Sequence, residues 1–326
     1  GVIGAKPKIA LYWCASCGGC EEAVLDLDAA LLDVVERVEL TLWPVALDFK
    51  YTDLEALEDG ALALAMINGA VRTSEQQHVA ELLRRKAQLV IAFGACAAWG
   101  GIPALANLTS RCELLRRAYL SAPGVSNPAG TLPTERVEVD GHAVELPALY
   151  ETVHALDAVI EVDYYLPGCP PTPRLIAAAL EAVLSGELPE RGAILAPNKS
   201  LCASCDRNSS KPDEIKLERL RRVVDTVVDP GTCFLAQGLV CMGPATRDGC
   251  EQPCINGNMP CTGCFGPTEG CLDQGAKMVG TLGGVLAGDD EQAVDDVLAG
   301  LPDPAGTFYR YSAAASLLGK QRPEKK

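Results

Sequence analysis

Residues 8–22 read KIALYWCASCGGCEE, a mostly apolar run followed by a turn rich in cysteine and glycine and then by two glutamates. The apolar run predicts a buried β-strand over Lys8–Trp13, and the apolar spacing beyond the turn predicts a helix over Glu21–Val35. The same order of strand, turn and helix recurs along the first half of the chain. Such alternation is typical of an α/β protein with a parallel, doubly wound sheet.

The other elements of this sheet are predicted from the same signals. We expect strands at Val38–Trp43, Leu62–Ile67, Gln88–Phe93 and Ile160–Leu166, helices at Ser74–Arg85 (capped by Ser74) and Arg174–Leu184, and a small hairpin at Val137–Leu146 turning at Asp140–Gly141. In parallel sheets of this kind, ligands bind in the crevice beyond the carboxyl ends of the strands. The functional residues are therefore expected in the loops that follow these strands.

The composition is that of a globular protein. The 326 residues contain 48% hydrophobic and 22% charged side chains, enough to bury a sizeable core. A net charge of −15 argues against nucleic acid as a partner, because phosphate binding needs basic patches. No uninterrupted apolar run of about 18 residues predicts a membrane span. The N-terminal residues are too polar for a secretory signal, so we expect a cytoplasmic protein with reduced thiols.

Cysteine is the unusual component, with fifteen residues against three histidines. Nine of the cysteines lie between residues 202 and 271, where apolar periodicity gives way to glycine, proline and closely spaced cysteine. We expect a boundary near Pro197–Asn198, between an α/β domain at 1–196 and a small, loop-rich domain at 197–326. Because dense reduced cysteine binds metal more often than it forms disulfides, the second domain is expected to be organised by metal rather than by an apolar core.

Cysteines follow three of the expected strands at their carboxyl ends. These positions are Cys17, Cys20, Cys96 and Cys169. Because those strand ends share one sheet edge, four thiolates meet there and suit a [4Fe–4S] cluster or a structural zinc ion. Cys14 and Cys17 have the same spacing as Cys17 and Cys20, so spacing alone does not choose between the two pairs. Taken singly, Cys96 and Cys169 also fit small buried thiols.

Eight further cysteines supply enough thiols for two more four-thiolate sites. They are Cys202, Cys205, Cys233, Cys241, Cys250, Cys254, Cys261 and Cys264. The two C-x-x-C pairs among them are strong ligand signals, for zinc as well as for iron. The lack of histidine in this region, together with three such sites in one acidic chain, favours an iron–sulfur redox relay. Nothing in the sequence pairs a cysteine with a histidine as a catalytic nucleophile would require.

Taken together, these motifs resemble the small subunit of nickel–iron hydrogenases. The stretch CGGCEE at residues 17–22 fits the family signature C-x-G-C-x-E, and GACA and PGCPP fit the loops that complete its proximal cluster. The resemblance implies that the first pair of ligands is Cys17 and Cys20, and it gives Cys14 no ligand position. It also places Glu22 on an acidic position for which a proton-relay role is implied. An ordinary carboxylate at a helix start is the alternative for Glu22.

The resemblance covers most of residues 8–280. It implies a distal cluster on Cys202, Cys205, Cys233 and Cys241 and a medial cluster on Cys250, Cys254, Cys261 and Cys264. Cys202 stands where respiratory members of the family carry a histidine ligand, and Cys254 stands where they usually carry proline. With cysteine at both positions, the resemblance implies three [4Fe–4S] clusters that are each held by four cysteines. With NKSLC, CMGPATR and NMPCTGCFGP, the chain is similar to the cytoplasmic, methyl-viologen-reducing subgroup. Cys112 and Cys271 match no ligand position.

The function implied by the resemblance is that of an electron-transfer subunit in a multi-subunit hydrogenase, an oxidoreductase that acts on H2. The nickel–iron site belongs to a separate large subunit, expected to dock at the proximal loops, and electrons leave the distal cluster for an acceptor such as a heterodisulfide reductase complex. The first domain is expected to be flavodoxin-like. An iron–sulfur subunit of a complex I-like quinone reductase is the alternative among redox proteins, and a zinc-stabilised scaffold is the alternative from another class.

Overall fold

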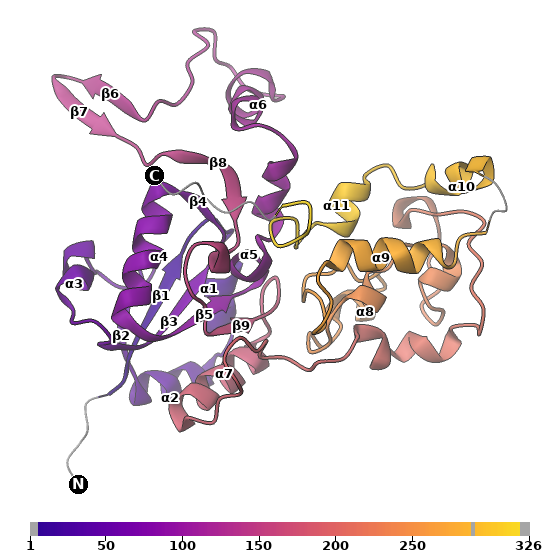
Figure 1. Cartoon of the computed structure of the whole chain (residues 1–326), viewed down its shortest axis with the longest axis horizontal. Coiled ribbons are helices and arrows are strands. Elements are labelled where there is room, and N and C mark those ends of the chain that lie inside the picture. Colours follow the sequence, from indigo (N-terminus) through magenta and orange to yellow (C-terminus); the bar gives the residue numbers. More distant parts are fainter. Residues whose placement is uncertain (1–5, 288–290, 320–326) are drawn as a thin grey trace.

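The structure is a computed structural model that describes residues 6–287 and 291–319. In the first half of the chain, a five-stranded, wholly parallel sheet forms the centre (Figure 1). The strands lie in the order β2 (Glu39–Leu42), β1 (Lys8–Trp13), β3 (Leu62–Asn68), β5 (Ala87–Phe93) and β9 (Tyr164–Leu166). When only the five strands of this sheet are numbered in sequence order, the spatial order becomes 2-1-3-4-5. This is the flavodoxin-like arrangement. The predicted α/β class and doubly wound sheet are confirmed.

Both faces of the sheet are covered by helices, which explains why its strands are apolar almost throughout. Ile9 and Leu11 of β1 belong to the core on one face, and Ala10 and Tyr12 belong to the core on the other. The first face is covered by α1 (Gly19–Leu25), α2 (Ala29–Arg37) and α7 (Pro173–Ser185), and the second by α3 (Tyr51–Ala56) and α4 (Ser74–Lys86).

Two local predictions about the helices are wrong. The single helix expected over Glu21–Val35 is divided between α1 and α2, because the chain turns at Asp28 with a φ of 53°. With a ψ of −127° this residue lies outside both helical regions, so the backbone cannot continue as a single helix through it. The cap of α4 is Thr73 rather than Ser74: the Thr73 hydroxyl accepts a hydrogen bond from the Gln76 amide, and the Gln76 side chain accepts one from the Thr73 amide.

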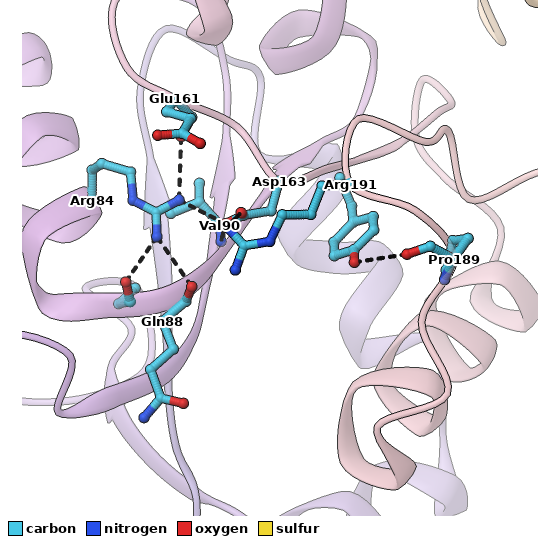
Figure 2. A network of polar contacts seen from close by, with 9 residues as sticks. Arg84, Gln88, Val90, Glu161, Asp163, Pro189 and Arg191 are labelled. Carbon is cyan, nitrogen blue, oxygen red and sulfur yellow. Dashed lines mark hydrogen bonds and ion pairs between the residues drawn. The ribbon is translucent and has the colours of Figure 1, made fainter.

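The last strand is shorter than predicted, because the residue before it is a buried carboxylate rather than part of the strand. Figure 2 shows Asp163 between two arginines at the edge of the sheet. Its side chain is fully buried, accepts a hydrogen bond from the Val90 amide at 2.7 Å, and forms ion pairs with Arg84 and Arg191 at 2.6 Å each. The carboxylate therefore joins β5 to the segment that enters β9.

Replacing Asp163 with alanine is expected to lower the free energy of unfolding by about 3 kcal/mol, since removing one partner of a buried pair leaves the other charge uncompensated. The measurement is denaturant unfolding of the purified protein. A matched control is Asp59→Ala, which removes an exposed carboxylate paired with Lys86 at 2.9 Å. That control is expected to cost less than about 1 kcal/mol, and equal losses for the two variants would contradict the role given to Asp163.

An insertion between β5 and β9 departs from the sheet. It contains α5 (Ala95–Trp99), α6 (Arg111–Arg116), the antiparallel hairpin of β6 (Arg136–Val139) and β7 (His142–Glu145), and β8 (Leu149–His154), which pairs with β4 (Val71–Thr73). The hairpin projects away from the sheet (Figure 1) and turns at Asp140–Gly141, both with positive φ. The hairpin prediction is confirmed, and the two positive φ angles are those that a tight two-residue turn requires.

The second half of the chain is rich in loops, as predicted, with the short helices α8 (Pro253–Asn256), α9 (Gln274–Gly283), α10 (Glu291–Leu298) and α11 (Pro304–Phe308). The expectation that this part lacks an apolar core is wrong, since Leu201, Phe234, Met278 and Phe308 are buried together. The outer ends of the two expected domains, residues 1–5 and 320–326, lie outside the described residues. Within the described ranges, no helix has the length and apolar character needed to cross a membrane.

Candidate metal centres

Four cysteines meet at the carboxyl edge of the sheet and are named here the proximal thiol set. They are Cys17, before α1; Cys20, in α1; Cys96, in α5; and Cys169, after β9. Backbone hydrogen bonds hold the loops after β5 and β9 side by side, from Gly94 to Leu166 at 2.8 Å and from Ala95 to Gly168 at 2.7 Å. The loops predicted to converge do so.

The electrostatics of the proximal thiol set show that its members are mutual neighbours. Burial raises the pKa of Cys20, and the thiols of Cys96, Cys169 and Cys17 raise it further. Burial raises the pKa of Cys96 to about 12, with Cys169 and Cys17 adding to the effect. The pKa of Cys169 is raised by burial and then by Cys17. Every pair among the four thiols therefore interacts.

The proximal thiol set fits an iron–sulfur centre in two respects. Buried thiols with raised pKa values lose their protons readily only when a cationic group compensates the charge, as metal ligation does. In addition, glycine backbone lies directly against the sulfur atoms: a Cβ at Gly94, where φ is 86°, would stand 2.5 Å from the sulfur of Cys20. Gly19 donates its amide hydrogen to the Cys17 sulfur at 3.4 Å. Iron–sulfur clusters are tuned by such amide hydrogen bonds.

A second group, the distal thiol set, lies in the second half of the chain. Its members are Cys202, Cys205, Cys233 and Cys241. Burial raises the pKa of Cys202 to about 12, and the other three thiols add to the effect. Burial likewise raises the pKa of Cys241 to about 11. Gly243 lies beside two of these sulfurs, since a Cβ there would be 3.1 Å from Cys202 and 3.5 Å from Cys241.

A third group, the medial thiol set, lies between the other two. Its members are Cys250, Cys254, Cys261 and Cys264. Burial raises the pKa of Cys264 to about 12, and Cys250, Cys169 and Cys254 raise it further. Burial also raises the pKa of Cys261, and the next causes are the thiols of Cys241 and Cys264. Cys254 is exposed, in the first turn of α8.

The three thiol sets contact each other in a row. Cys264 of the medial set interacts with Cys169 of the proximal set, whose backbone amide also lowers the Cys264 pKa against the larger effect of burial. Cys261 of the medial set interacts with Cys241 of the distal set. The amide of Met242 donates to the Cys261 carbonyl at 2.9 Å. In residues 6–287 and 291–319, no three histidine, cysteine, aspartate or glutamate side chains converge closely enough to hold a single metal ion.

The three remaining cysteines lie outside these sets. Cys14 is 5% exposed and belongs to the apolar core on one face of the sheet. Cys112 is exposed on α6. Cys271 is half-buried, with its thiol 3.5 Å from the Asp273 carbonyl oxygen.

The buried carboxylate beside the proximal thiol set is Glu21 rather than Glu22, which is exposed. Glu21 accepts hydrogen bonds from the Trp43 indole and, at 2.6 Å, from the Asn68 amide. Burial raises its pKa, while these two hydrogen bonds act in the opposite direction. The sequence does not reveal this difference, because adjacent glutamates at the start of a helix look equivalent until the tertiary packing is known.

Arg207 is a second residue that sequence reasoning missed. It is 6% exposed and lies over the Phe234 ring, 4.1 Å from the ring centre. Its guanidinium donates to the Asp229 carbonyl at 2.9 Å and to the Asn258 side chain at 2.8 Å. These contacts join the loop that leads to the distal thiol set with the loop of the medial thiol set. No periodic signal marks the arginine, which stands in an irregular polar stretch.

Comparisons with known proteins agree with this arrangement. Residues 17–183 match the family described as NADH ubiquinone oxidoreductase, 20 Kd subunit. The chain is 36% identical over 317 residues to an iron–sulfur subunit of the F420-non-reducing hydrogenase of Archaeoglobus profundus, covering 96% of this chain and 98% of that one. It is 34% identical over 319 residues to a subunit of the F420-non-reducing hydrogenase of Methanothermobacter marburgensis, covering 97% of each.

The fold of a solved structure is also similar. A chain of the recombinant [NiFeSe] hydrogenase from Desulfovibrio vulgaris Hildenborough matches with a TM-score of 0.51 and 18% identity, covering 83% of this chain and 96% of that one. This likeness concerns the fold alone.

Proposed function

Because the chain belongs to the NADH ubiquinone oxidoreductase 20 Kd subunit family and, within it, to the iron–sulfur subunits of F420-non-reducing hydrogenases, we propose that it carries electrons away from a hydrogenase active site through three [4Fe–4S] clusters. The hydrogenase is an oxidoreductase of several subunits, and H2 is oxidised at a nickel–iron centre in a separate large subunit. Each cluster, when bound, takes up and releases one electron at a time.

The observation that carries this proposal is the row of three thiol sets. Each set has four thiols, and the contacts of Cys169 with Cys264 and of Cys261 with Cys241 connect one set to the next. We assign the proximal, medial and distal clusters to the sets of the same names, with the first set in the domain at 1–196 and the other two in the domain at 197–326. Electrons enter at the proximal set and leave at the distal set.

The partners follow from this direction of flow. The large subunit docks on the loops at Cys17–Glu22, Ala95–Gly101 and Gly168–Pro173, because these surround the proximal thiol set. An iron–sulfur acceptor subunit, such as one of a heterodisulfide reductase complex, docks near Cys202–Asp206 and Cys233. We place the protein in the cytoplasm, where a reducing environment keeps its cysteines available as ligands.

Metal and sulfide analysis of the complex, purified without oxygen, tests the proposal. Three four-iron clusters give about 12 iron atoms per chain with matching acid-labile sulfide. A three-iron medial site, with Cys254 outside the ligand set, gives about 11. Zinc without sulfide would support a zinc-stabilised scaffold instead, and co-purification with quinone-reducing subunits rather than a nickel–iron subunit would support the complex I-like alternative.

Glu22 is exposed on α1, two residues after Cys20 in the sequence, and we infer that a proton relay to the large subunit begins there. Glu22→Gln is therefore expected to slow hydrogen–deuterium exchange by the order of 10²-fold, the lower range for a positioned acid–base group, and to slow dye reduction less. Asp26→Asn, an exposed carboxylate at the end of α1, is the matched control. Equal losses in exchange and dye reduction would show general disruption and refute the proton role.

A further inference from the structure

The two halves of the chain lie side by side (Figure 1), and the proximal and medial thiol sets meet where the halves touch. The contact between the loop of Cys169 and the loop of Cys264 is named here the first junction. These loops come from different halves, so neither the sheet of the first half nor the apolar core of the second fixes their separation by itself. Contacts between the halves have to fix it.

Arg247, in the second half, is fully buried and holds the turn that follows Cys264. Its backbone amide donates to the Gly266 carbonyl at 2.8 Å. Its side-chain Nε donates to the Pro267 carbonyl at 3.2 Å. Gly266 and Pro267 stand two and three positions after Cys264 in the sequence. The backbone and the side chain of one arginine therefore hold the same turn.

The other end of the guanidinium holds the segment between the two halves. Its Nη1 donates to the carbonyl oxygens of Ala196 and Pro197 at 3.1 Å each. The residue before them pairs with β9, since the Leu195 amide donates to the Tyr165 carbonyl at 2.8 Å. Because β9 leads into the loop of Cys169, the arginine connects the medial turn with the strand that positions a proximal thiol.

Two glycines show how closely the halves approach each other at this place. A Cβ on Gly266, where φ is 68°, would stand 2.4 Å from the ring of Trp99, which ends α5, the helix that carries a proximal thiol. A Cβ on Gly249, where φ is 114°, would stand 3.0 Å from Pro197. The turn therefore has no room to move toward the first half, and the hydrogen bonds of Arg247 keep it from moving away.

A buried guanidinium holds its partners firmly because its charge is costly to leave unsatisfied. Taking a charge out of water is unfavourable unless hydrogen bonds in the protein replace the lost solvation. If the turn separated from the segment at 196–198, donors of Arg247 would lose their acceptors at a side chain that solvent does not reach. The two sets of contacts are therefore kept together.

We propose that Arg247 is a positioning residue for electron transfer, which fixes the separation of the proximal and medial sites at the first junction. The inference rests on the proposed function, since it assigns both thiol sets to iron–sulfur clusters. Arg247 takes up no electron itself. It sets the distance over which one electron passes from the proximal to the medial site, and electron transfer falls steeply with distance.

The test compares Arg247→Met with the parent in the assembled complex, purified without oxygen. Methionine is also long and unbranched but has no donors, so the turn and the segment at 196–198 lose their connection. Electron paramagnetic resonance of the hydrogen-reduced complex measures the magnetic coupling between neighbouring clusters, which weakens as they separate. We expect weaker coupling and viologen reduction slower by the order of 10-fold, the lower range for losing an outer-shell partner. Iron content and hydrogen–deuterium exchange should stay at parent values.

The matched control is Arg174→Gln. Arg174 also connects the two halves, because its Nε donates to the Glu251 carboxylate at 2.7 Å, but both side chains are more than half exposed. Exposed ion pairs contribute little to stability, so the control should keep the coupling and the viologen reduction of the parent. Equal effects in Arg174→Gln and Arg247→Met would overturn the role given to Arg247.

Coupling equal to that of the parent in an iron-complete Arg247→Met complex would overturn the inference and leave the proposed function standing. If Arg247→Met loses iron, Arg247→Lys decides, because lysine keeps the buried charge but has one nitrogen for the two segments that arginine joins with two. Weaker coupling in an iron-complete Arg247→Lys complex supports the inference. Parent-like coupling there, or loss of iron from this variant as well, overturns it in favour of a general structural role. A parent complex without iron–sulfur signals would instead refute the proposed function itself, and the inference with it.

Discussion

Alanine in place of Cys169 is expected to stop the reduction of every electron acceptor, dye or protein, while hydrogen–deuterium exchange continues at the large subunit. Cys169 has two roles in the geometry: it completes the proximal thiol set, and it contacts Cys264 of the medial thiol set. On the proposed assignment, its loss removes a proximal ligand and lengthens the path from the proximal to the medial cluster, and electron transfer falls steeply with distance. The decrease should exceed the roughly 10- to 100-fold typical of losing an outer-shell partner of a metal ligand.

The measurement pairs two assays on one anaerobic preparation, hydrogen-dependent viologen reduction and hydrogen–deuterium exchange. Cys112→Ala is the matched control, because that thiol is exposed on α6 and belongs to none of the thiol sets. Unchanged viologen reduction in Cys169→Ala would mean that electrons do not cross this junction. Loss of the large subunit from the preparation would mark an assembly defect, which exchange and subunit composition together would reveal.

The sheet and its cysteine-bearing edge were predictable because both depend on local signals. The strand at Lys8–Trp13 is apolar on both faces, and the structure places it at the same residues. Once the strands are parallel, their carboxyl ends must share an edge, so the convergence of Cys17, Cys96 and Cys169 follows from topology. Spacing in the sequence could not decide whether Cys14 was a ligand candidate. The structure separates it from the proximal thiol set because it faces the core.

Contacts between distant segments were not predictable from the sequence. The order of the thiol sets depends on which loop lies beside which, and the pairs Cys169 with Cys264 and Cys261 with Cys241 join residues that no periodicity relates. The same holds for Arg247, which joins the segment between the two halves to the turn after Cys264. A glycine-rich, proline-rich stretch also conceals its core, because Phe234 and Met278 come together without any helical or strand-like spacing between them.

Cys202 provides the test at the other end of the row. Its replacement by alanine is expected to abolish reduction of the physiological protein acceptor, while hydrogen–deuterium exchange survives and viologen reduction is partly retained. Cys202 is not among the groups that act on Cys261 or Cys264 of the medial thiol set, so the two earlier sets are expected to keep their own thiols and the contact between Cys169 and Cys264. Iron content should fall from about 12 to about 8 per chain when one four-iron cluster is lost.

A conservative variant separates the loss of a cluster from a general disturbance of the second domain. Cys202→His keeps a metal-binding side chain at the position where respiratory members of the family carry histidine, so it should retain iron and restore part of the transfer to the acceptor. The proposed direction of flow predicts a contrast with Cys169→Ala. A break at the proximal junction should stop transfer to both dye and protein acceptors, whereas a break at the distal set should stop transfer to the protein acceptor first. If Cys202→Ala instead reduced exchange, viologen reduction and acceptor reduction to the same extent in an intact complex, the distal set would not be the exit, and the assigned order of the three sets would be wrong.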